Sequence, residues 1–375
     1  MKKTFVTIFD RTRNFHLVKD VGQIPYHISQ EHEYISKIVT CKNEDNYSYL
    51  DNEVKGLQID FIKNFKIFKI NFGVIFYLIK NAKNINVLHQ FHIRNYTLIY
   101  AMVYKILNKK GLNYIKADAD EKDLIQRGTI IKKKYHNIIN KYVDLISFET
   151  NEIVRLAQEE NISFKNKFFK ISNGIDEKYL EKLDLNKIDC TKKENVIIYV
   201  ARIGTYQKNT ELFLDVIERV QLEDWKVYLI GEIDNKFKSF IQHYFEKNKH
   251  LVDKVIFLGN INSRKEIYNY YKKSKIFCMT SRFEGFPLVY PEAIYFGNFI
   301  LTTNVSGSID ITDNNKYGKI VSDFSVESFS VILNDLILSS KINFALCQEI
   351  RKFAIENFTW QSIVSVLDKK LKERE

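Results

Sequence analysis

The sequence predicts an α/β protein built from two doubly wound, Rossmann-like domains. Its 375 residues exceed what one ordinary hydrophobic core holds, so two domains of about 150–200 residues each are expected. Short β-branched runs alternate with helical patterns, which is typical of a parallel sheet covered by helices. The same alternation restarts after about residue 193, and this restart separates the two domains.

Each element of this prediction rests on a local pattern. The first half predicts strands at Thr4–Phe9, Ile35–Thr40, Asn86–Phe91, Tyr114–Ala117, Leu145–Glu149 and Phe168–Ile171, with helices such as Tyr96–Leu107 and Asn151–Glu160. The second half predicts strands at Val196–Val200, Trp225–Ile230, Lys254–Phe257, Ile276–Met279, Phe299–Thr302 and Gly318–Val321. A final amphipathic helix is predicted over Trp360–Leu371, with Ile363, Val364, Val366, Leu367 and Leu371 on one side.

The composition is that of a folded protein with unevenly distributed charge. Hydrophobic residues make up 45% of the chain and charged residues 27%, which argues against an intrinsically disordered protein. The net charge is +11, and residues 1–180 contribute +9 of it. A basic face indicates a polyanionic partner such as nucleic acid, phospholipid or a phosphorylated substrate. A solvated charged surface is an equal alternative.

The four cysteines, Cys41, Cys190, Cys278 and Cys347, are far apart and include no C-x-x-C pair. This spacing argues against a zinc ribbon or a disulfide framework and fits a reducing cytosol. The N-terminus has no apolar signal-peptide region, and the longest apolar stretch, Ile67–Ile79, is too short to span a bilayer. We therefore expect a cytoplasmic protein.

The strongest chemical signal is the segment Ser281–Gly297. Pro291 has no amide hydrogen, so it favours the first turn of a helix that begins one to three residues before it. The amides of Gly285, Phe286 and Leu288 would then be unpaired at the positive end of that helix, available to hydroxyls or an anion.

Two carboxylates flank these amides. Glu284 precedes them and Glu292 lies just inside the predicted helix, so the pair could accept hydrogen bonds from two sets of sugar hydroxyls. The spacing alone carries no information, because a surface carboxylate and a helix-dipole partner would look the same.

A second loop, after the strand Val196–Val200, holds two cations. Arg202 and Lys208 are placed where they could clamp a pyrophosphate and stabilise negative charge on a departing group. An arginine and a lysine six residues apart are, in isolation, more often ordinary surface residues.

Together these loops resemble the donor site of glycosyltransferase family 4 (glycosyl transferases group 1), a retaining GT-B family. Glu-Gly-Phe-Pro-Leu followed by Glu-Ala resembles its donor-site motif, and the Arg202–Lys208 loop resembles its Gly-Arg…Lys-Gly segment. This chain departs from the family by having Ala201 and Asn209 in place of the two glycines. The resemblance covers about residues 145–325.

The resemblance implies a GT-B fold, in which two Rossmann-like domains face each other across a cleft. Residues 1–175 would form the acceptor-binding domain and residues 176–357 the nucleotide-sugar-binding domain. Residues 358–375 would form a helix that packs back on the N-terminal domain. Ile171–Asp176 resembles the connection between the domains.

Two further positions are expected at the donor site. The turn Phe257–Ile261, which includes Asn260, resembles the turn whose backbone contacts the nucleobase. Gly22, after the first strand, would allow close approach of a substrate, and Pro25 suits a helix start. An ordinary βα loop would also explain Gly22.

The N-terminal half contains two ambiguous motifs. Asp118-Ala-Asp120 has the D-x-D form of metal-dependent, single-domain glycosyltransferases, but such a match is often accidental; by resemblance, Asp118 or Lys116 could instead face the donor sugar. The segment Arg127–Tyr142 combines three consecutive lysines with isoleucines, which fits a basic amphipathic surface for anionic lipid or, equally, a solvated helix.

The resulting expectation is a hexosyltransferase that uses a nucleotide-diphosphate sugar as co-substrate, with no metal and no cofactor. Arg202 and Lys208 would hold the diphosphate, Glu292 the ribose, and Glu284 with the neighbouring amides the sugar. Asp118 is the candidate catalytic contribution of the first domain. The acceptor would be a carbohydrate or lipid-linked molecule, as in the synthesis of bacterial surface polysaccharide. The +9 charge of the first half and the apolar stretch Ile67–Ile79 suggest that the basic N-terminal domain contacts the inner face of an anionic membrane.

Other functions remain open at this point. An inverting GT-B transferase or a sugar-nucleotide epimerase would have the same architecture. A nucleic-acid-binding protein is suggested by the basic charge, but no recognisable RNA- or DNA-binding motif is present. An inactive carbohydrate-binding scaffold is disfavoured because both glutamates and both cations are retained.

Overall fold

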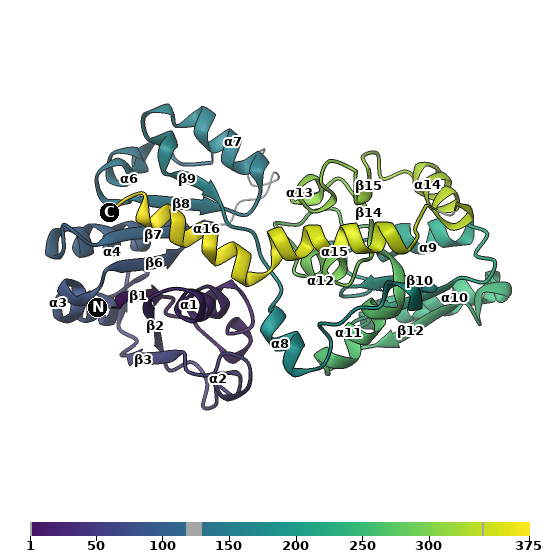
Figure 1. Ribbon diagram of the computed structural model, residues 1–375, viewed down its shortest axis with the longest axis horizontal. Helices are drawn as coiled ribbons and strands as arrows, with labels where there is room; N and C mark the ends of the chain where they lie inside the picture. Colours follow the sequence, from purple (N-terminus) through teal and green to yellow (C-terminus); the bar gives the residue numbers. More distant parts are fainter. Residues whose placement is uncertain (1, 118–129, 340) are drawn as a thin grey trace. The chain divides into compact units, whose positions relative to one another are not determined.

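The computed structural model describes residues 2–117, 130–339 and 341–375. The chain divides into two compact units, of which unit 1 runs to Asp176 and includes Thr359–Glu375, while unit 2 comprises Glu177–Phe358. Figure 1 shows a helix-covered sheet in each unit. Both are parallel, Rossmann-like α/β sheets, which confirms the predicted fold class.

The sheet of unit 1 has the order β3-β2-β1-β6-β7-β8-β9, and its neighbouring strands pair in parallel. Its strands are β1 (Lys3–Ile8), β2 (Tyr34–Cys41), β3 (Gln58–Ile62), β6 (Val87–Phe91), β7 (Leu112–Lys116), β8 (Leu145–Phe148) and β9 (Phe168–Lys170). A separate antiparallel hairpin joins β4 (Lys66–Ile67) to β5 (Ile70–Asn71).

Helices cover both faces of this sheet because its strands bury side chains alternately on each side. Phe5 packs with α1 and α16, whereas Val6 packs with α3 and α4. The helices of unit 1 are α1 (Asp20–Glu31), α2 (Tyr49–Asn52), α3 (Phe72–Asn81), α4 (Asn95–Leu107), α6 (His136–Tyr142), α7 (Asn151–Glu160) and α16 (Trp360–Lys372).

Unit 2 has the strand order β12-β11-β10-β13-β14-β15, also with parallel pairing. Its strands are β10 (Glu194–Val200), β11 (Lys226–Ile230), β12 (Val255–Gly259), β13 (Ser274–Met279), β14 (Phe299–Thr303) and β15 (Gly318–Val321). Its helices are α8 (Glu177–Lys182), α9 (Thr210–Glu218), α10 (Lys238–Lys247), α11 (Arg264–Lys273), α12 (Val289–Tyr295), α13 (Ser308–Thr312), α14 (Val326–Leu338) and α15 (Phe344–Phe358).

Numbered along the chain within unit 2, this order reads 3-2-1-4-5-6, the Rossmann order. The order reverses between β10 and β13, and sheets of this kind bind their ligands at the carboxyl edge at such a reversal. A ligand of this unit is therefore expected at the ends of β10 and β13.

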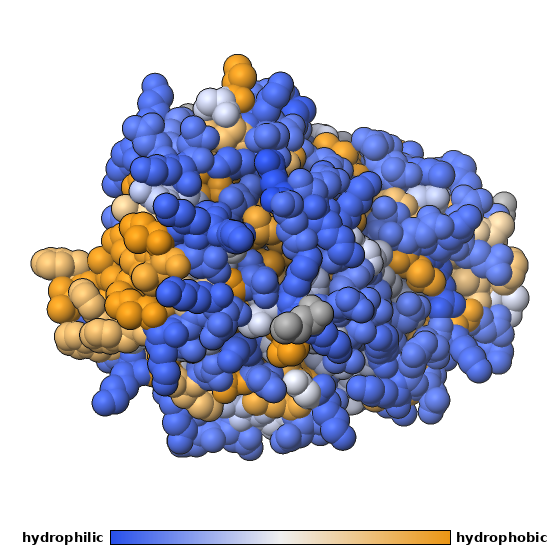
Figure 2. All heavy atoms as spheres, turned by 60° about the vertical axis from the view of Figure 1, so that its left-hand side comes forward, coloured by the Kyte–Doolittle hydropathy of each residue, from blue (hydrophilic) through white to orange (hydrophobic). Residues whose placement is uncertain are grey.

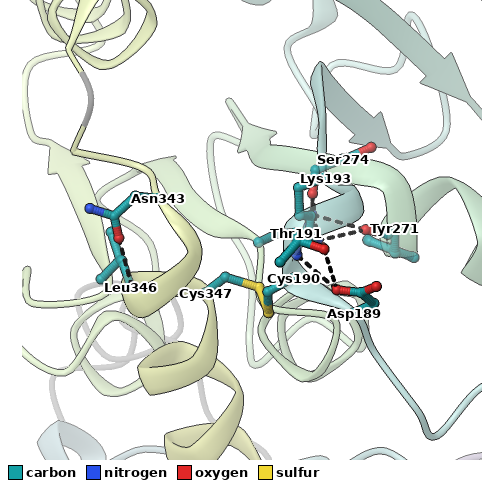
Figure 3. Close-up of a disulfide and its surroundings, with 10 residues drawn as sticks. Asp189, Cys190, Thr191, Lys193, Tyr271, Ser274, Asn343, Leu346 and Cys347 are labelled. Carbon is teal, nitrogen blue, oxygen red and sulfur yellow. Dashed lines mark hydrogen bonds between the residues drawn. A yellow bond between two sulfur atoms is a disulfide. The ribbon is translucent and has the colours of Figure 1, made fainter.

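The expectation of unpaired cysteines is wrong for one pair. Cys190 and Cys347 form a disulfide with a Cα–Cα distance of 6.0 Å, although 157 positions separate them in sequence. Figure 3 shows how the segment that contains Asp189 and Thr191 meets α15 at this bond. Spacing along the chain does not reveal such a pair, because the fold of unit 2 brings the two segments together. Cys41 and Cys278 are buried free thiols.

The disulfide between Cys190 and Cys347 can be tested by peptide mapping and by its effect on stability. Non-reducing peptide mapping is expected to find the peptide of Cys190 joined to that of Cys347. Closing a loop of this length restricts the unfolded chain, so Cys190→Ser with Cys347→Ser should lower the free energy of unfolding by about 2–5 kcal/mol. Equal stability of the variant and the oxidised wild type would contradict this expectation.

The lipid-binding interpretation of the segment 127–142 is wrong for its described part. Ile131 and Ile139 are buried in the hydrophobic core, and Ile130 and Ile138 pack against it. The isoleucines therefore do not form an apolar outer face, and the lysines around them belong to a solvated surface. Within the described ranges, no helix combines the length and apolarity that crossing a membrane requires.

Two expectations about the start of α1 are also corrected. A Cβ atom added at Gly22 would lie 2.3 Å from the carbonyl oxygen of Leu17, so the close approach that this glycine permits is that of the protein's own backbone. Pro25 lies inside α1, five residues after its first residue, and does not start the helix.

Candidate functional site

The two loops singled out by sequence lie at the reversal of strand order in unit 2. The first, which carries Arg202 and Lys208, follows β10, and the second, which carries Glu284, follows β13. Because β10 and β13 are adjacent and parallel, their carboxyl ends bring the two loops together. The structure thus joins residues that are more than 70 positions apart.

The central contact is an ion pair between Lys208 and Glu284. The Lys208 Nζ atom lies 2.5 Å from Glu284 Oε1, and the two side chains are only 13% and 8% exposed. Gln207 donates through Nε2 to the second oxygen of Glu284 at 3.3 Å and to the carbonyl of Phe283 at 3.1 Å. Arg202 Nη2 donates in turn to Gln207 Oε1 at 2.9 Å.

Buried hydroxyl groups hold the backbone around Lys208 in place through hydrogen bonds to its carbonyl groups. Tyr199 donates to the Lys208 carbonyl at 2.7 Å, and Thr280 donates to the same carbonyl at 3.2 Å and to that of Asn209 at 3.0 Å. Tyr199 lies on β10 and Thr280 directly after β13. These bonds hold the cation-bearing loop against the neighbouring strand, which reduces the reorganisation that ligand binding would require.

Asn209 explains one departure from the resembled family. Its φ is +51°, in the left-handed region that glycine adopts most easily and that asparagine tolerates best among other residues. Asparagine therefore tolerates here a conformation that glycine would adopt most easily.

Arg282 is a third cation of the same loops, and sequence reasoning missed it. Its Nη1 donates to the carbonyl of Tyr206 at 2.6 Å, and its guanidinium lies 4.4 Å from the centre of the Tyr206 ring. Its own amide donates to the Gln207 carbonyl at 2.8 Å. Arg202, Lys208 and Arg282 against Glu284 give these loops a net charge of +2, which suits a diphosphate.

Helix α12 begins at Val289, and Pro291 lies in its first turn, as predicted. Among the described residues, the backbone amides of Gly285 and Leu288 have no hydrogen-bond partner. The side chain of Phe286 is 4% exposed and stacks on Phe358, with ring centroids 5.8 Å apart. The Phe286 side chain is therefore buried against another aromatic ring.

Glu292 lies beside Arg264, Tyr268 and Tyr271. Burial raises the pKa of Glu292 to about 7, while the Arg264 guanidinium and the hydroxyls of Tyr271 and Tyr268 act in the opposite direction. Arg264, at the start of α11, donates to the Tyr268 hydroxyl at 2.6 Å. Glu292 is thus a carboxyl group whose charge changes near neutral pH.

This raised pKa predicts how stability depends on pH. Folding favours the protonated form of Glu292, so its contribution is present below about pH 4.5 and is lost as the pH rises to about 7. Glu292→Gln should reduce the loss of unfolding free energy between pH 5 and pH 8 by as much as about 3 kcal/mol. Chemical denaturation at several pH values measures this difference.

The matched control is Glu356→Gln, which changes an exposed glutamate of α15 that lies 3.9 Å from Lys352. Its profile should follow that of the wild type. If both variants kept the wild-type pH dependence, Glu292 would titrate as an ordinary carboxyl group.

The remaining expected site residues are placed as follows. Asn260 follows β12 in an exposed turn and donates through Nδ2 to Asn262 Oδ1 at 2.8 Å. Gly22 lies in unit 1 within α1. Asp118 and Asp120 lie outside the described residues.

Unit 1 contains a buried ion cluster that the sequence did not reveal. Lys116, the last residue of β7, is fully buried, and its Nζ lies 2.8 Å from Asp20 Oδ2 and 2.9 Å from Glu149 Oε1. Burial by itself would raise the pKa of Asp20, but the charge and the hydrogen bond of Lys116 lower it below its usual value. Lys116 is therefore engaged inside unit 1, contrary to the interpretation that it faces a donor sugar.

Some residues of the site and of the buried cluster were not predicted, and the sequence gives little indication of them beyond their position. Gln207 and Arg282 lie beside Lys208 and Glu284, and could have been suggested only by that position. Lys116, Asp20 and Glu149 each lie at a strand end or helix start, which is typical of polar residues in any α/β fold.

Known proteins resemble this chain in sequence. Residues 182–357 match the family described as Glycosyl transferases group 1. The amylovoran biosynthesis glycosyltransferase AmsD of Erwinia amylovora is 30% identical over 169 residues, which are 43% of this chain and 45% of that protein. The GalNAc-alpha-(1->4)-GalNAc-alpha-(1->3)-diNAcBac-PP-undecaprenol alpha-1,4-N-acetyl-D-galactosaminyltransferase of Campylobacter jejuni is 29% identical over 35% of each chain. The chain thus spans less than half the length of these curated relatives.

Solved structures share the fold of the whole chain. The lipopolysaccharide outer core galactosyltransferase WaaB, in its apo form, has a TM-score of 0.71 at 16% identity, with all of both chains covered. Anabaena HepE, crystallised in complex with UDP, has a TM-score of 0.69 at 12% identity, again over both complete chains. These likenesses show that the fold is of the GT-B type.

Proposed function

Because residues 182–357 match the Glycosyl transferases group 1 family, we propose that this protein transfers a sugar from a nucleotide-diphosphate donor to an acceptor hydroxyl. The observation that carries the proposal is the network of Arg202, Gln207, Lys208 and Glu284. It combines fixed cations with a poised carboxylate at the point where a Rossmann-like sheet binds its ligand.

The proposed reaction breaks one bond and forms another at the anomeric carbon of the sugar. The bond from this carbon to the diphosphate breaks, and the electron pair leaves with the phosphate oxygen. The acceptor oxygen bonds to the same carbon from the same face, and its proton passes to the departing phosphate. The configuration at the anomeric carbon is thereby retained.

Each cation of the network has a role in this reaction. Arg202 and Lys208 stabilise the charge that develops on the diphosphate, which would make a metal ion unnecessary. Because they are already held by Gln207 and by Glu284, they need little rearrangement as the charge appears.

The carboxylates and amides would orient the donor. Glu284 accepts a hydrogen bond from a sugar hydroxyl, and the amides of Gly285, Phe286 and Leu288 donate to the same sugar. Glu292 holds the ribose, and the backbone of the turn at Asn260 contacts the nucleobase. Since ionised Glu292 accepts hydrogen bonds best, KM for the donor should fall from pH 6 to pH 8. Asp118, in the N-terminal half of the chain, is proposed as a second catalytic residue.

The proposed acceptor is a carbohydrate or a lipid-linked molecule, and the sugar a hexose. The names of the relatives support this class, since one belongs to amylovoran biosynthesis and another acts on an undecaprenol-linked oligosaccharide. A role in the synthesis of bacterial surface polysaccharide at the cytoplasmic side of the membrane follows from this proposal.

A donor-hydrolysis assay tests this function without knowledge of the acceptor. UDP-, GDP- and ADP-hexoses are incubated with the protein, and nucleoside diphosphate release is measured together with proton NMR of the sugar. The expected result is release of one nucleotide and a sugar that first appears with the donor's anomeric configuration. An inverted first product would indicate an inverting transferase, and an epimerised nucleotide sugar would indicate an epimerase. Absence of all turnover, with water or with added oligosaccharide acceptors, would contradict the proposal.

A further inference from the structure

The β4–β5 hairpin and helix α3 of unit 1 expose an unusual set of large apolar side chains. Their exposed fractions are 95% for Phe68, 62% for Phe76, 59% for Ile79, 52% for Phe65 and 43% for Ile67. We call these five residues the hairpin surface. In Figure 1 α3 lies at the left end, and Figure 2, which brings that side forward, shows hydrophobic residues gathered at its left edge among hydrophilic ones.

The hairpin surface is continuous. Phe65 packs against Phe72, with ring centroids 5.6 Å apart, and Phe72 opens helix α3. Phe76 and Ile79 follow at helical spacing on the same side of α3. The opposite side of the helix is buried in the core through Val74 and Leu78, so α3 is apolar on both sides. A helix of this kind needs cover on its outer side as well.

The base of the hairpin is packed against the start of α3. Asn71 accepts a hydrogen bond from the amide of Gly73 at 3.0 Å and thereby caps α3. The amide of Phe72 donates to the carbonyl of Phe65 at 2.8 Å. A Cβ atom at Gly73 would lie 2.2 Å from the carbonyl of Lys63, so hairpin and helix are packed together at this point.

The backbone conformation at the tip of the hairpin is unfavourable for the two residues that occupy it. Phe68 and Lys69 have φ values of +48° and +69°, as in the two-residue turns for which Asn-Gly is the preferred sequence. A bulky aromatic residue disfavours this conformation. Local stability therefore does not explain the presence of Phe68 at an almost fully exposed position.

The charged residues within the segment that carries the hairpin surface are all basic. Residues 61–83 contain no Asp or Glu and five lysines, namely Lys63, Lys66, Lys69, Lys80 and Lys83. Lys66 pairs with Asp10 at 2.8 Å. The other four lysines are exposed: Lys69 on the hairpin, Lys80 on α3, and Lys63 and Lys83 directly before the hairpin and after the helix.

We propose that the hairpin surface docks unit 1 on an anionic lipid bilayer, with Phe68 and its apolar neighbours entering the headgroup–acyl boundary. The lysines complement anionic headgroups, and the phenylalanine and isoleucine side chains suit hydrocarbon. The aliphatic members favour lipid over nucleic acid, because stacking on bases would use aromatic rings alone. This docking does not depend on the donor site of unit 2.

Vesicle co-sedimentation measures the docking directly. The full chain is mixed with vesicles of phosphatidylcholine alone or with one third phosphatidylglycerol, and the bound fraction is measured. Binding to the anionic vesicles should be at least about tenfold tighter and should weaken between 50 and 500 mM salt. Phe68→Asp should lower it at least about tenfold. The matched control is Ile162→Asp, at an apolar residue of unit 1 that is 73% exposed but lies outside the hairpin surface.

A second variant separates docking from folding. Phe68→Asn with Lys69→Gly gives the turn its preferred sequence, so the thermal midpoint should stay the same or rise while vesicle binding falls. If this variant were as stable as expected but bound vesicles like the wild type, the tip would not take part in docking.

A third set of variants tests the charge. Changing Lys63, Lys80 and Lys83 to Gln should weaken binding to anionic vesicles by roughly fivefold for each lysine. The control changes three equally exposed lysines of the same unit, Lys132, Lys133 and Lys134, and should have a small effect. Equal losses from both triple variants would show non-specific attraction and would overturn the assignment to this surface.

Other occupants give different outcomes. Single-stranded RNA that displaced the vesicles, or a Phe68-dependent dimer seen by light scattering, would replace the lipid proposal with another partner. Failure to bind any anionic vesicle would also overturn it. The nucleotide-release assay is run without lipid, so its result stands apart from all of these.

Discussion

Lys208→Met is expected to lower kcat for nucleotide release and sugar transfer by about 100- to 1,000-fold. The Lys208 ammonium lies in a nearly buried ion pair 2.5 Å from Glu284, where little water competes with it. A fixed charge in such a place stabilises a leaving diphosphate far more than it would in water. Steady-state kinetics at saturating donor measures the effect, because an interaction made chiefly in the transition state appears in kcat.

The variant also leaves the carboxylate of Glu284 without its cation, so stability must be measured beside activity. A loss of about 1–3 kcal/mol in unfolding free energy is expected from this change. Lys341→Met, which removes an exposed lysine paired with Asp335 at 3.0 Å, is the control and should leave kcat unchanged. A stable Lys208→Met protein with wild-type kcat would remove Lys208 from the reaction.

Lys116→Met is expected to lower the free energy of unfolding by about 3–5 kcal/mol. Lys116 is fully buried between Asp20 and Glu149, which are themselves 16% and 8% exposed. Removing the cation leaves two carboxylates close together in a poorly solvated place, and such breakage costs more than the intact cluster contributes. Chemical denaturation of the variant and the wild type measures the difference.

Two further variants define the cause of that loss. Adding Asp20→Asn and Glu149→Gln to Lys116→Met removes the uncompensated charges and should restore much of the stability. Lys37→Met breaks a more exposed pair with Asp60, at 2.9 Å, and should cost at most about 1 kcal/mol. If Lys116→Met were as mild as Lys37→Met, the cluster would not be a buried structural element.

The parallel sheets could be predicted from sequence because their strands are buried and apolar. The predicted strand Gly318–Val321 is observed with the same bounds, and the others differ by one or two residues at their ends. β3 was missed because Gln58–Ile62 is a partly exposed edge strand with mixed polarity. The β4–β5 hairpin was missed because its turn, Phe68-Lys69, has none of the usual turn residues.

Arg202, Lys208 and Glu284 could be predicted as site residues because each lies in a short sequence motif that is recognisable by itself. The network that joins the loops could not, because Gln207 reaches Glu284 across 77 positions and Arg282 reaches Tyr206 across 76. The same limit hid the disulfide of Cys190 with Cys347. It also led to the lysine-rich segment 132–134 being considered for lipid, since sequence does not show that its isoleucines face inward.

Donor binding by the network of Arg202, Gln207, Lys208 and Glu284 is the central claim, and a thermal-shift screen with UDP-, GDP-, ADP- and CMP-sugars tests it most directly. At least one nucleotide-diphosphate sugar is expected to raise the thermal midpoint of the wild type. The change of Arg202→Ala with Lys208→Ala is expected to abolish the shift. A screen in which no donor stabilised the wild type, or in which the double variant kept the full shift, would contradict the account.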